Sequence, residues 1–413
     1  MNSTPRGLRP HIGIFGRRNV GKSSLINALT NQEVAIVSNV SGTTTDPVYK
    51  SLELLPFGPV VIIDTAGLDD EGFLGEMRKK KSLEILRRCD VALLVWDVNS
   101  DLSLERELLQ LLRENQVITL GVKNKIDQDG KEISSSLDIP IFPTSTITGE
   151  GILQLKQAIV EVLQKYHQEK PLIKDLINPG EVVLLVVPID LSAPKGRLIL
   201  PQVQTIREIL DAEAVAVVAK ERELTETLER LKTPPRLVVT DSQVFHKVAG
   251  AVPPTIPLTS FSILFARYKG DLFSFVKGVQ TVERLNPGDK VLIAEACSHH
   301  PLPDDIGRVK IPRWLRQRVG GDLQFEVVAG VNFPENLEDY QLIVQCGGCM
   351  INQKEMSYRL HQAQKAGVPI TNYGVIIAYL QGVFPRALEV FPEMKGIEGV
   401  TLTPETFKKI PGS

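Results

Sequence analysis

Three of the four cysteines in this chain lie near its carboxyl end, where their spacing could support metal binding. Cys297 is followed two residues later by His299, and Cys346 and Cys349 form a Cys-x-x-Cys turn with two glycines between them. The glycines allow both sulfurs to point toward one centre. Thiolates and imidazoles bind soft metal ions, so we expect a metal site here.

The elements around these cysteines are expected to bring them to one edge of a sheet. Apolar runs at 290–296 and 340–345 predict buried parallel strands, with Cys297 and Cys346 just beyond their ends. In an open α/β sheet, ligands bind at the carboxyl ends of the strands. Residues 352–366 predict a helix, whose amino-terminal dipole would favour a thiolate at Cys349.

Two metal sites and one simpler interpretation fit these residues. The three cysteines with His299 would suit a closed Cys3His zinc site. Three cysteines with an open or weakly held fourth position would suit a 4Fe–4S cluster, which the spacing favours. Alternatively, the cysteines are small buried apolar residues without a ligand.

Length and composition indicate an ordinary globular protein. The 413 residues are enough for about two to four domains. A formal net charge of −2 argues against a protein that coats nucleic acid. Residues 1–10 lack the apolar core of a signal peptide, and no apolar run approaches the length of about 20 residues that spans a bilayer. We expect a cytoplasmic protein without a membrane or nucleic-acid partner, and clustered cysteines fit such a reducing compartment.

A phosphate-binding loop follows a short predicted strand at 11–15. Residues 16–23 match the pattern Gly-x4-Gly-Lys-Ser without a gap. In such a loop, backbone N–H groups wrap the phosphates, Lys22 reaches the β- and γ-phosphates, and the Ser23 hydroxyl binds Mg²⁺. The helix that follows points its positive end at the nucleotide. The predicted nucleotide contacts of this loop are Gly16, Asn19, Val20, Gly21, Lys22, Ser23 and Ser24.

Two further motifs complete the phosphate and magnesium site. Thr44 lies in a polar loop and could bind Mg²⁺ once the γ-phosphate is present. A predicted strand at 60–63 leads to Asp64, which can hold Mg²⁺ through water, and the Gly67 N–H can meet the γ-phosphate. Such loops become ordered with a nucleoside triphosphate and relax after hydrolysis.

A base-recognition motif indicates that the nucleotide is GTP or GDP. Asn124, Lys125 and Asp127 follow a predicted strand at 118–122. The Asp127 carboxylate can accept hydrogen bonds from N1–H and the 2-amino group of guanine, and adenine would leave it unpaired. Ser145 and Thr146 follow a later strand and could close over the base.

These nucleotide motifs resemble the Era and MnmE branch of the small GTPases over about residues 9–168. The resemblance implies that Thr44 is a magnesium ligand and that Asn19 is a potassium ligand. Leu68 stands where Ras-like enzymes carry the glutamine that orients water. Because an apolar side chain cannot orient water, we expect slow hydrolysis that K⁺ stimulates.

The remaining segments predict two smaller α/β regions. A linker at 169–181 precedes alternating strands and helices, which indicate a parallel sheet without a catalytic constellation. We expect this region to bring chains together. Residues 258–282 predict helix. A predicted helix around Trp314 could attract an anionic cofactor or an acidic partner, or present a solvated face, through five basic residues: Arg308, Lys310, Arg313, Arg316 and Arg318.

The cysteine pattern attached to this GTPase resembles the HydF family of iron–iron hydrogenase maturation scaffolds. The resemblance implies that Cys297, Cys346 and Cys349 hold a 4Fe–4S cluster, with His299 as a candidate fourth ligand. It also implies a carrier that receives a diiron precursor from two radical-SAM maturases and delivers it to the apo FeFe-hydrogenase. The family resemblance further implies a homodimer or a higher homo-oligomer.

We therefore expect an α/β protein of three domains, with a mainly parallel sheet in the first. The predicted divisions are a P-loop GTPase domain at 1–168, a linker at 169–181, a dimerisation domain at 182–265 and a cluster-binding domain at 266–413. One alternative is a ribosome- or RNA-associated GTPase with a Cys3His structural zinc. Another is a redox-sensing GTPase that uses Cys346 and Cys349 as a dithiol, which would leave Cys297 unexplained.

Overall fold

The computed structural model describes most of the chain, in two compact units. The described residues are 7, 9–30, 48–65, 85–98, 100–128, 137–166, 170–188, 198–296, 305–330, 333–334 and 336–395. The units comprise Met1–Glu169 and Lys170–Ser413. Among the described residues, no helix is both long enough and apolar enough to cross a bilayer.

The amino-terminal unit is built on a six-stranded sheet with strand order β2-β3-β1-β4-β5-β6. Strand β2 is antiparallel to β3, and all other neighbours are parallel. The strands are β1 (His11–Phe15), β2 (Val48–Leu54), β3 (Gly58–Asp64), β4 (Val91–Asp97), β5 (Ile118–Asn124) and β6 (Ile141–Pro143). The helices are α1 (Lys22–Thr30), α3 (Ser103–Glu114) and α4 (Ile152–Tyr166).

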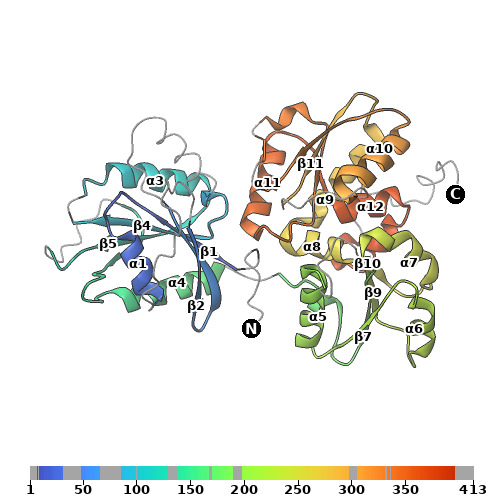
Figure 1. The fold of residues 1–413 in the computed structure, drawn as a ribbon, viewed down its shortest axis with the longest axis horizontal. Coiled ribbons are helices and arrows are strands. Elements are labelled where there is room, and N and C mark those ends of the chain that lie inside the picture. The colour runs from blue at the N-terminus through green and yellow to red at the C-terminus, as the bar shows by residue number, and fades with distance from the viewer. Residues whose placement is uncertain are drawn as a thin grey trace. The chain divides into compact units, whose positions relative to one another are not determined.

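Successive residues of β4 enter two different cores, because side chains alternate between the faces of a strand. Leu93 and Val95 pack in the core that includes the buried residues of α1 and α4. Leu94 and Trp96 pack in the core that includes the buried residues of α3. Figure 1 shows α3 on the face of the sheet opposite α1 and α4. Such burial on both faces explains why this strand is a continuous apolar run.

The carboxyl-terminal unit contains two four-stranded parallel sheets, ordered β10-β9-β7-β8 and β12-β11-β13-β14. The strands of the first sheet are β7 (Val182–Val186), β8 (Val215–Ala219), β9 (Leu237–Thr240) and β10 (Leu258–Ser260). Those of the second are β11 (Lys290–Ala294), β12 (Gln324–Val328), β13 (Leu342–Gln345) and β14 (Ile370–Asn372).

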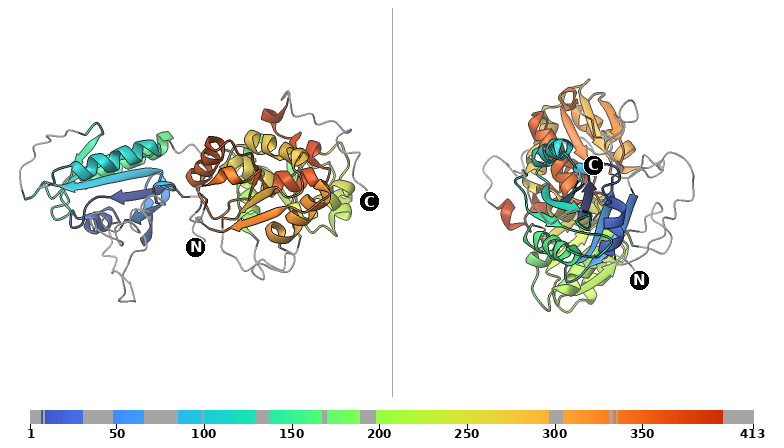
Figure 2. Two further views of the ribbon diagram at one scale, coloured as in Figure 1. Left: turned by 90° about the horizontal axis from the view of Figure 1, so that it is seen from above. Right: turned by 90° about the vertical axis from the view of Figure 1, so that its left-hand side faces the viewer.

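Helices of this unit join its two sheets. The helices are α5 (Leu200–Asp211), α6 (Leu224–Arg230), α7 (Phe245–Ala251), α8 (Phe261–Lys269), α9 (Leu272–Val279), α10 (Ile311–Val319), α11 (Gln353–Lys365), α12 (Tyr373–Leu380) and α13 (Phe384–Leu388). Helix α9 packs on β14, α12 packs on α8, and α13 packs on β10. Figure 1 shows α8, α9 and α12 between the sheets, and Figure 2 gives two further views of this unit. The arrangement confirms the predicted α/β class with mainly parallel sheets.

Two predicted elements differ from the observed ones. The predicted helix at 258–282 begins instead with strand β10, and it breaks at Gly270 between α8 and α9. Strand β10 has only three residues, all buried, so it carries no alternation that the sequence could reveal. The predicted basic helix begins as a π-helix at Ile306–Lys310 before α10. The domain divisions remain predictions, and α8 continues across the one placed between 265 and 266.

Replacing Gly278 in α9 with alanine is expected to destabilise the carboxyl-terminal unit. A Cβ at this position would lie 2.0 Å from the backbone oxygen of Ile370 in β14, so helix and strand would have to separate. Overpacking of this kind costs about 1–3 kcal/mol of unfolding free energy, which exceeds the gain of about 0.5–1 kcal/mol in helix propensity. Urea unfolding followed by circular dichroism measures the difference.

Gly250→Ala in α7 is the matched control, because nothing lies within 4 Å of a Cβ at that position. This variant should be as stable as the parent protein or slightly more stable. Equal stability of Gly278→Ala and Gly250→Ala would contradict the close approach of α9 to β14.

Candidate functional site

The phosphate-binding loop lies between β1 and α1, at the carboxyl end of a central strand. Gly21 has φ +94°, and a Cβ there would lie 2.3 Å from Asn124 Nδ2, so only glycine fits. Asn124 Nδ2 donates a hydrogen bond to the Val20 carbonyl at 2.9 Å. The base-recognition motif is therefore tied directly to the phosphate loop, across 104 positions of sequence.

Lys22 and two of the three predicted magnesium ligands, Ser23 and Asp64, lie near the start of α1. Lys22 is buried, and its Nζ donates to the carbonyls of Gly16 at 2.8 Å and Arg17 at 2.6 Å. Ser23 Oγ donates to Asp64 Oδ2 at 3.2 Å. Burial raises the pKa of Asp64, whereas the hydrogen bond from Ser23 and the charge of Lys22 act in the opposite direction. A hydroxyl from α1 and a carboxylate from β3 thus lie within hydrogen-bonding distance of each other, close enough to bind the same Mg²⁺ ion.

The predicted base-binding residues also come together. Ser145 is buried, and its Oγ donates to Asp127 Oδ1 at 2.6 Å. Lys125 forms an ion pair at 3.0 Å with Asp97, the last residue of β4. This pair fixes the position of the Lys125 side chain. Thr146, the residue after Ser145, is partly exposed. The Asp127 carboxylate is thereby oriented before any base arrives.

The other predicted nucleotide residues are placed as follows. Asn19 and Ser24 are exposed, and Asn19 has φ +63°, a conformation that asparagine tolerates better than most side chains. Thr44 and Gly67 lie outside the described residues, as does Leu68.

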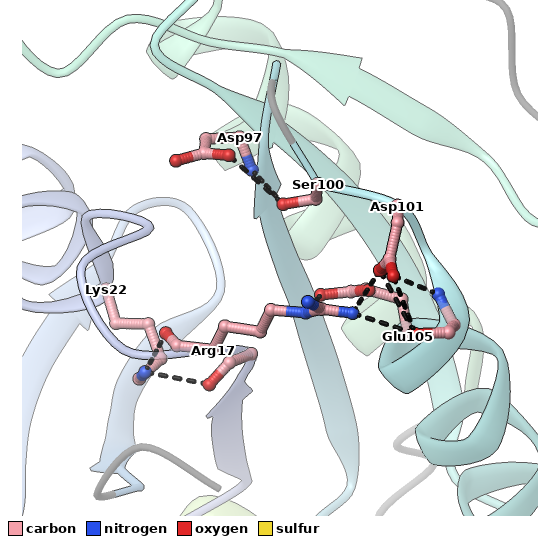
Figure 3. A network of polar contacts seen from close by, with 8 residues as sticks. Arg17, Lys22, Asp97, Ser100, Asp101 and Glu105 are labelled. Atoms are coloured by element: carbon pink, nitrogen blue, oxygen red, sulfur yellow. Dashed lines mark hydrogen bonds and ion pairs between the residues drawn. The ribbon is translucent and has the colours of Figure 1, made fainter. Parts of the chain in front are cut away.

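An ion-pair network that the sequence analysis did not predict anchors the phosphate loop to α3 (Figure 3). Arg17 pairs with Asp101 and with Glu105, the latter at 3.4 Å. The Glu105 side chain is fully buried, whereas that of Asp101 is 68% exposed. Hydrogen bonds from Ser103 hold the pKa of Asp101 below its ordinary value. No local pattern links residue 17 to α3, so these partners could not be paired from the sequence.

The cysteine loop follows β13 as the sequence predicts. Gly348 has φ +64°, and a Cβ there would lie 2.6 Å from Met356 Cε, which favours glycine in this turn. Helix α11 then begins with Asn352 as its cap, whose side chain accepts a hydrogen bond from the Glu355 N–H at 3.0 Å. Cys346 and Cys349 are both partly buried and both free.

Hydrogen-bond donors converge on the Cys346 sulfur. The backbone N–H groups of Ala296 and Gly348 approach Sγ at 3.0 and 3.5 Å, and Gln345 Nε2 also lies at 3.5 Å. Burial raises the pKa of the Cys346 and Cys349 thiols, whereas the Gly348 N–H acts in the opposite direction on Cys346. Donors of this kind stabilise a thiolate and, in iron–sulfur proteins, tune the cluster.

Two buried cations lie beside this loop, and the sequence analysis missed both. Lys269 Nζ donates to three carbonyls of the loop region, and burial lowers the pKa of Lys269 to about 8. Arg359 is fully buried and donates to Gln345 Oε1 and Glu355 Oε1, each at 3.1 Å. Lys269 is far from the loop cysteines in sequence, and Arg359 lies inside helix α11. No sequence motif therefore indicates the role of either residue.

Cys297 and His299 lie outside the described residues, so the predicted ligand set is not tested. Within the described ranges, no group of three or more histidine, cysteine or acidic residues could hold a metal ion. Ala296, the residue before Cys297, is described, and its backbone N–H donates to the Cys346 sulfur. The chain therefore approaches the cysteine loop immediately before Cys297.

Three of the five basic residues of the predicted basic helix pair with carboxylates of the chain, which favours the interpretation as a solvated face. Arg308 pairs with the buried Glu295 at 2.8 Å. Two further arginines also have carboxylate partners, as Arg316 pairs with Asp322 and Arg318 with Glu283.

Replacing Arg17 with methionine is expected to lower the stability of the amino-terminal unit by about 3 kcal/mol, because the buried Glu105 carboxylate would lose its cation. Trp96 fluorescence during urea unfolding, in a Trp314→Phe background, reports on this unit alone, because Trp96 is buried in β4. Asp101→Asn is the control, since it removes the charge of an exposed pair of the same arginine but keeps a side-chain oxygen that can accept the hydrogen bonds from Ser103, and it should leave the transition nearly unchanged. Equal effects of the two substitutions would rule out the buried pair as the anchor.

Three successive parts of the chain match known protein families. Residues 11–125 match the model described as 50S ribosome-binding GTPase. Residues 172–270 match the Hydrogen maturase F dimerization domain, and residues 273–390 match the Hydrogen maturase F tetramerization domain.

Individual relatives are similar over the GTPase part. The tRNA modification GTPase MnmE of Moorella thermoacetica is 36% identical over 165 residues, which are 37% of this chain and 34% of the relative. GTPase Der of Campylobacter hominis is 32% identical over 175 residues, 38% of this chain and 37% of the relative. The solved G domain of the T. maritima FeoB iron transporter has 29% identity and a TM-score of 0.31, covering 38% of this chain and 99% of that domain.

This chain spans only about a third of the length of the curated relatives. The similarity to these relatives is therefore limited to the GTPase part of the chain. The rest of the chain matches the two hydrogen maturase F models in succession, and these together span more than half of the 413 residues. With a P-loop GTPase domain followed by both of these domains, the chain belongs to the HydF family of hydrogenase maturation proteins.

Proposed function

We propose that this protein is a GTP-hydrolysing scaffold that binds a 4Fe–4S cluster and carries a diiron precursor to the apo FeFe-hydrogenase. The observation that carries the proposal is the Cys346–Cys349 loop, where N–H donors point at a sulfur beside the end of a parallel strand. Membership of the HydF family supports the maturation role. The two radical-SAM maturases are the proposed source of the precursor.

The nucleotide half of the proposal rests on the phosphate loop and its partners. Ser23 and Asp64 would hold Mg²⁺, and Asp127, oriented by Ser145, would select guanine. Hydrolysis of GTP to GDP and phosphate would be slow, because an apolar Leu68 occupies the position of a water-orienting glutamine. Asn19, exposed on the loop, is the proposed contact for a stimulating K⁺.

The cluster half of the proposal rests on the fit of the described residues to an anionic metal centre. Cys346 and Cys349, with Cys297, would hold the cluster, and His299 is a candidate for the fourth position. When bound, such a cluster supplies iron that can exchange ligands and electrons. The chain itself contributes N–H donors to the Cys346 sulfur and buried cations behind the loop. A precursor must bind and leave, which an open fourth position permits.

The described edge strand β8 supports self-association. Val215 and Val218 are each 47% exposed in β8, and within the described sheet β8 pairs only with β7. Val203 and Leu210 of the adjoining α5 are also exposed. An apolar, unpaired edge is a template for pairing with another strand, so we propose that a second copy of the chain covers it.

An alternative function is that of a ribosome- or RNA-associated GTPase with a structural zinc. The description of the model matched at 11–125 favours it. Measuring which metal the protein binds distinguishes the cluster scaffold from the zinc-containing GTPase. A bound zinc ion gives no visible absorption, whereas a 4Fe–4S cluster does.

Anaerobic reconstitution with iron and sulfide is expected to give a broad absorption near about 400 nm, where thiolate-to-iron charge transfer lies. Replacing Cys297, Cys346 or Cys349 individually with serine should abolish this absorption. Cys89→Ser is the matched control and should keep it, because Cys89 lies in the core of the amino-terminal unit. A colourless protein with one bound zinc would contradict the cluster and favour the alternative.

Val218→Lys is expected to weaken self-association at least tenfold, equivalent to about 1.4 kcal/mol, because a charge would enter the apolar edge. Sedimentation equilibrium measures the dissociation constant. Leu153→Lys replaces an apolar residue of α4 that is even more exposed than Val218, and it should leave assembly unchanged. If Val218→Lys assembles as the parent protein does, β8 is not the contact.

A further inference from the structure

Lys269 occupies an unusual position for a lysine, at the end of α8 and behind the cysteine loop. Its side chain is almost fully buried. Its Nζ donates to the carbonyls of Gly348 at 2.7 Å, Cys349 at 3.2 Å and Ile351 at 2.8 Å. An ammonium group has three donors and no acceptor, so these three carbonyls use its full capacity. The Phe265 ring, 5.8 Å away, covers another side of the charge.

A buried ammonium is a costly way to tie down a loop. Taking a charge out of water costs several kcal/mol, and a neutral donor could bond to carbonyls without that cost. Its Nζ contacts the backbone carbonyls of Gly348 and of Cys349 itself, so the ammonium group lies beside the Cys-x-x-Cys turn. The positive charge therefore faces groups that become negative when they bind a metal.

We propose that Lys269 is a positioning and charge-compensating residue for the cluster, an inference that rests on the cluster-binding function proposed above. Through three hydrogen bonds, Lys269 fixes the carbonyls of the loop, so that Cys346 and Cys349 keep their sulfurs toward one centre. Its charge offsets the negative charge of the thiolates and of the cluster they hold.

The same contact ties the loop to the domain that precedes it. Lys269 belongs to the segment that matches the dimerization model, whereas the loop belongs to the tetramerization segment. A neighbour of Lys269 strengthens this connection, because the Tyr268 carbonyl accepts a hydrogen bond from Gln353 Nε2, at the start of α11, at 2.8 Å. The geometry of the cysteine loop thus depends on the end of α8.

The charge of Lys269 has a direct consequence for redox behaviour. Reduction adds a negative charge to the centre, and a nearby buried cation stabilises that charge. Lys269→Met keeps much of the side-chain volume but removes the charge and all three donors. The variant should therefore hold the reduced state less well and hold the loop less firmly.

The test compares the reconstituted full-length protein with its Lys269→Met variant. An electron paramagnetic resonance titration should give a midpoint potential lower by at least about 59 mV, which corresponds to a tenfold change in the reduced-to-oxidised ratio. Loss of iron to a chelator should be at least tenfold faster. Lys277→Met on α9 is the matched control, because Lys277 is exposed, and both quantities should equal those of the parent protein.

Each outcome decides the inference. If Lys269→Met binds the cluster with the parent potential and the parent rate of iron loss, the inference is wrong while the proposed function stands. If the parent protein itself forms no cluster, the proposed function fails and the inference fails with it. If Lys269→Met does not fold, Lys269→Gln is measured instead, since it keeps donors without charge. If Lys269→Gln has the same midpoint potential as the parent protein, or if it also fails to fold, Lys269 has a purely structural role and the inference is wrong.

Discussion

Parallel pairing of neighbouring strands is the constraint on which both candidate sites depend. In the carboxyl-terminal unit, Ala294 of β11 lies beside Gln345 of β13, so the residues that follow the two strands emerge together. This register brings the Ala296 N–H to the Cys346 sulfur. In the amino-terminal unit, Ile14 of β1 lies beside Asp64 of β3, which brings Asp64 to the start of α1. A shift of one residue in either pair would separate the groups that each site needs.

The two sites hold their loops by similar physical means. In each case, a nearly buried lysine donates hydrogen bonds to loop carbonyls, as Lys22 does to Gly16 and Lys269 does to Gly348. Beside the cysteine loop, the backbone N–H groups of Ala296 and Gly348 also donate to the Cys346 sulfur, which favours a thiolate there. The buried cation thus fixes the backbone of the loop and favours negative charge beside it.

Local patterns indicated candidate residues for both sites, because a phosphate loop and a Cys-x-x-Cys turn are contiguous in sequence. They also predicted the α/β class, since continuous apolar runs indicate strands buried on both faces. The partners that support these residues could not be predicted. Lys269 lies 79 positions before Gly348, and Glu105 is also far from Arg17 in sequence, so only the folded chain brings these partners together. Strand β10 was missed because three buried residues carry no periodicity.

We propose that three cysteines of this chain hold a cluster with four irons. Mössbauer spectroscopy of the full-length protein, reconstituted with ⁵⁷Fe, tests it most directly. We expect about four irons per chain, of which one differs from the others because the three cysteines bind only three of them. Retention of a single zinc ion with no cluster iron would contradict it.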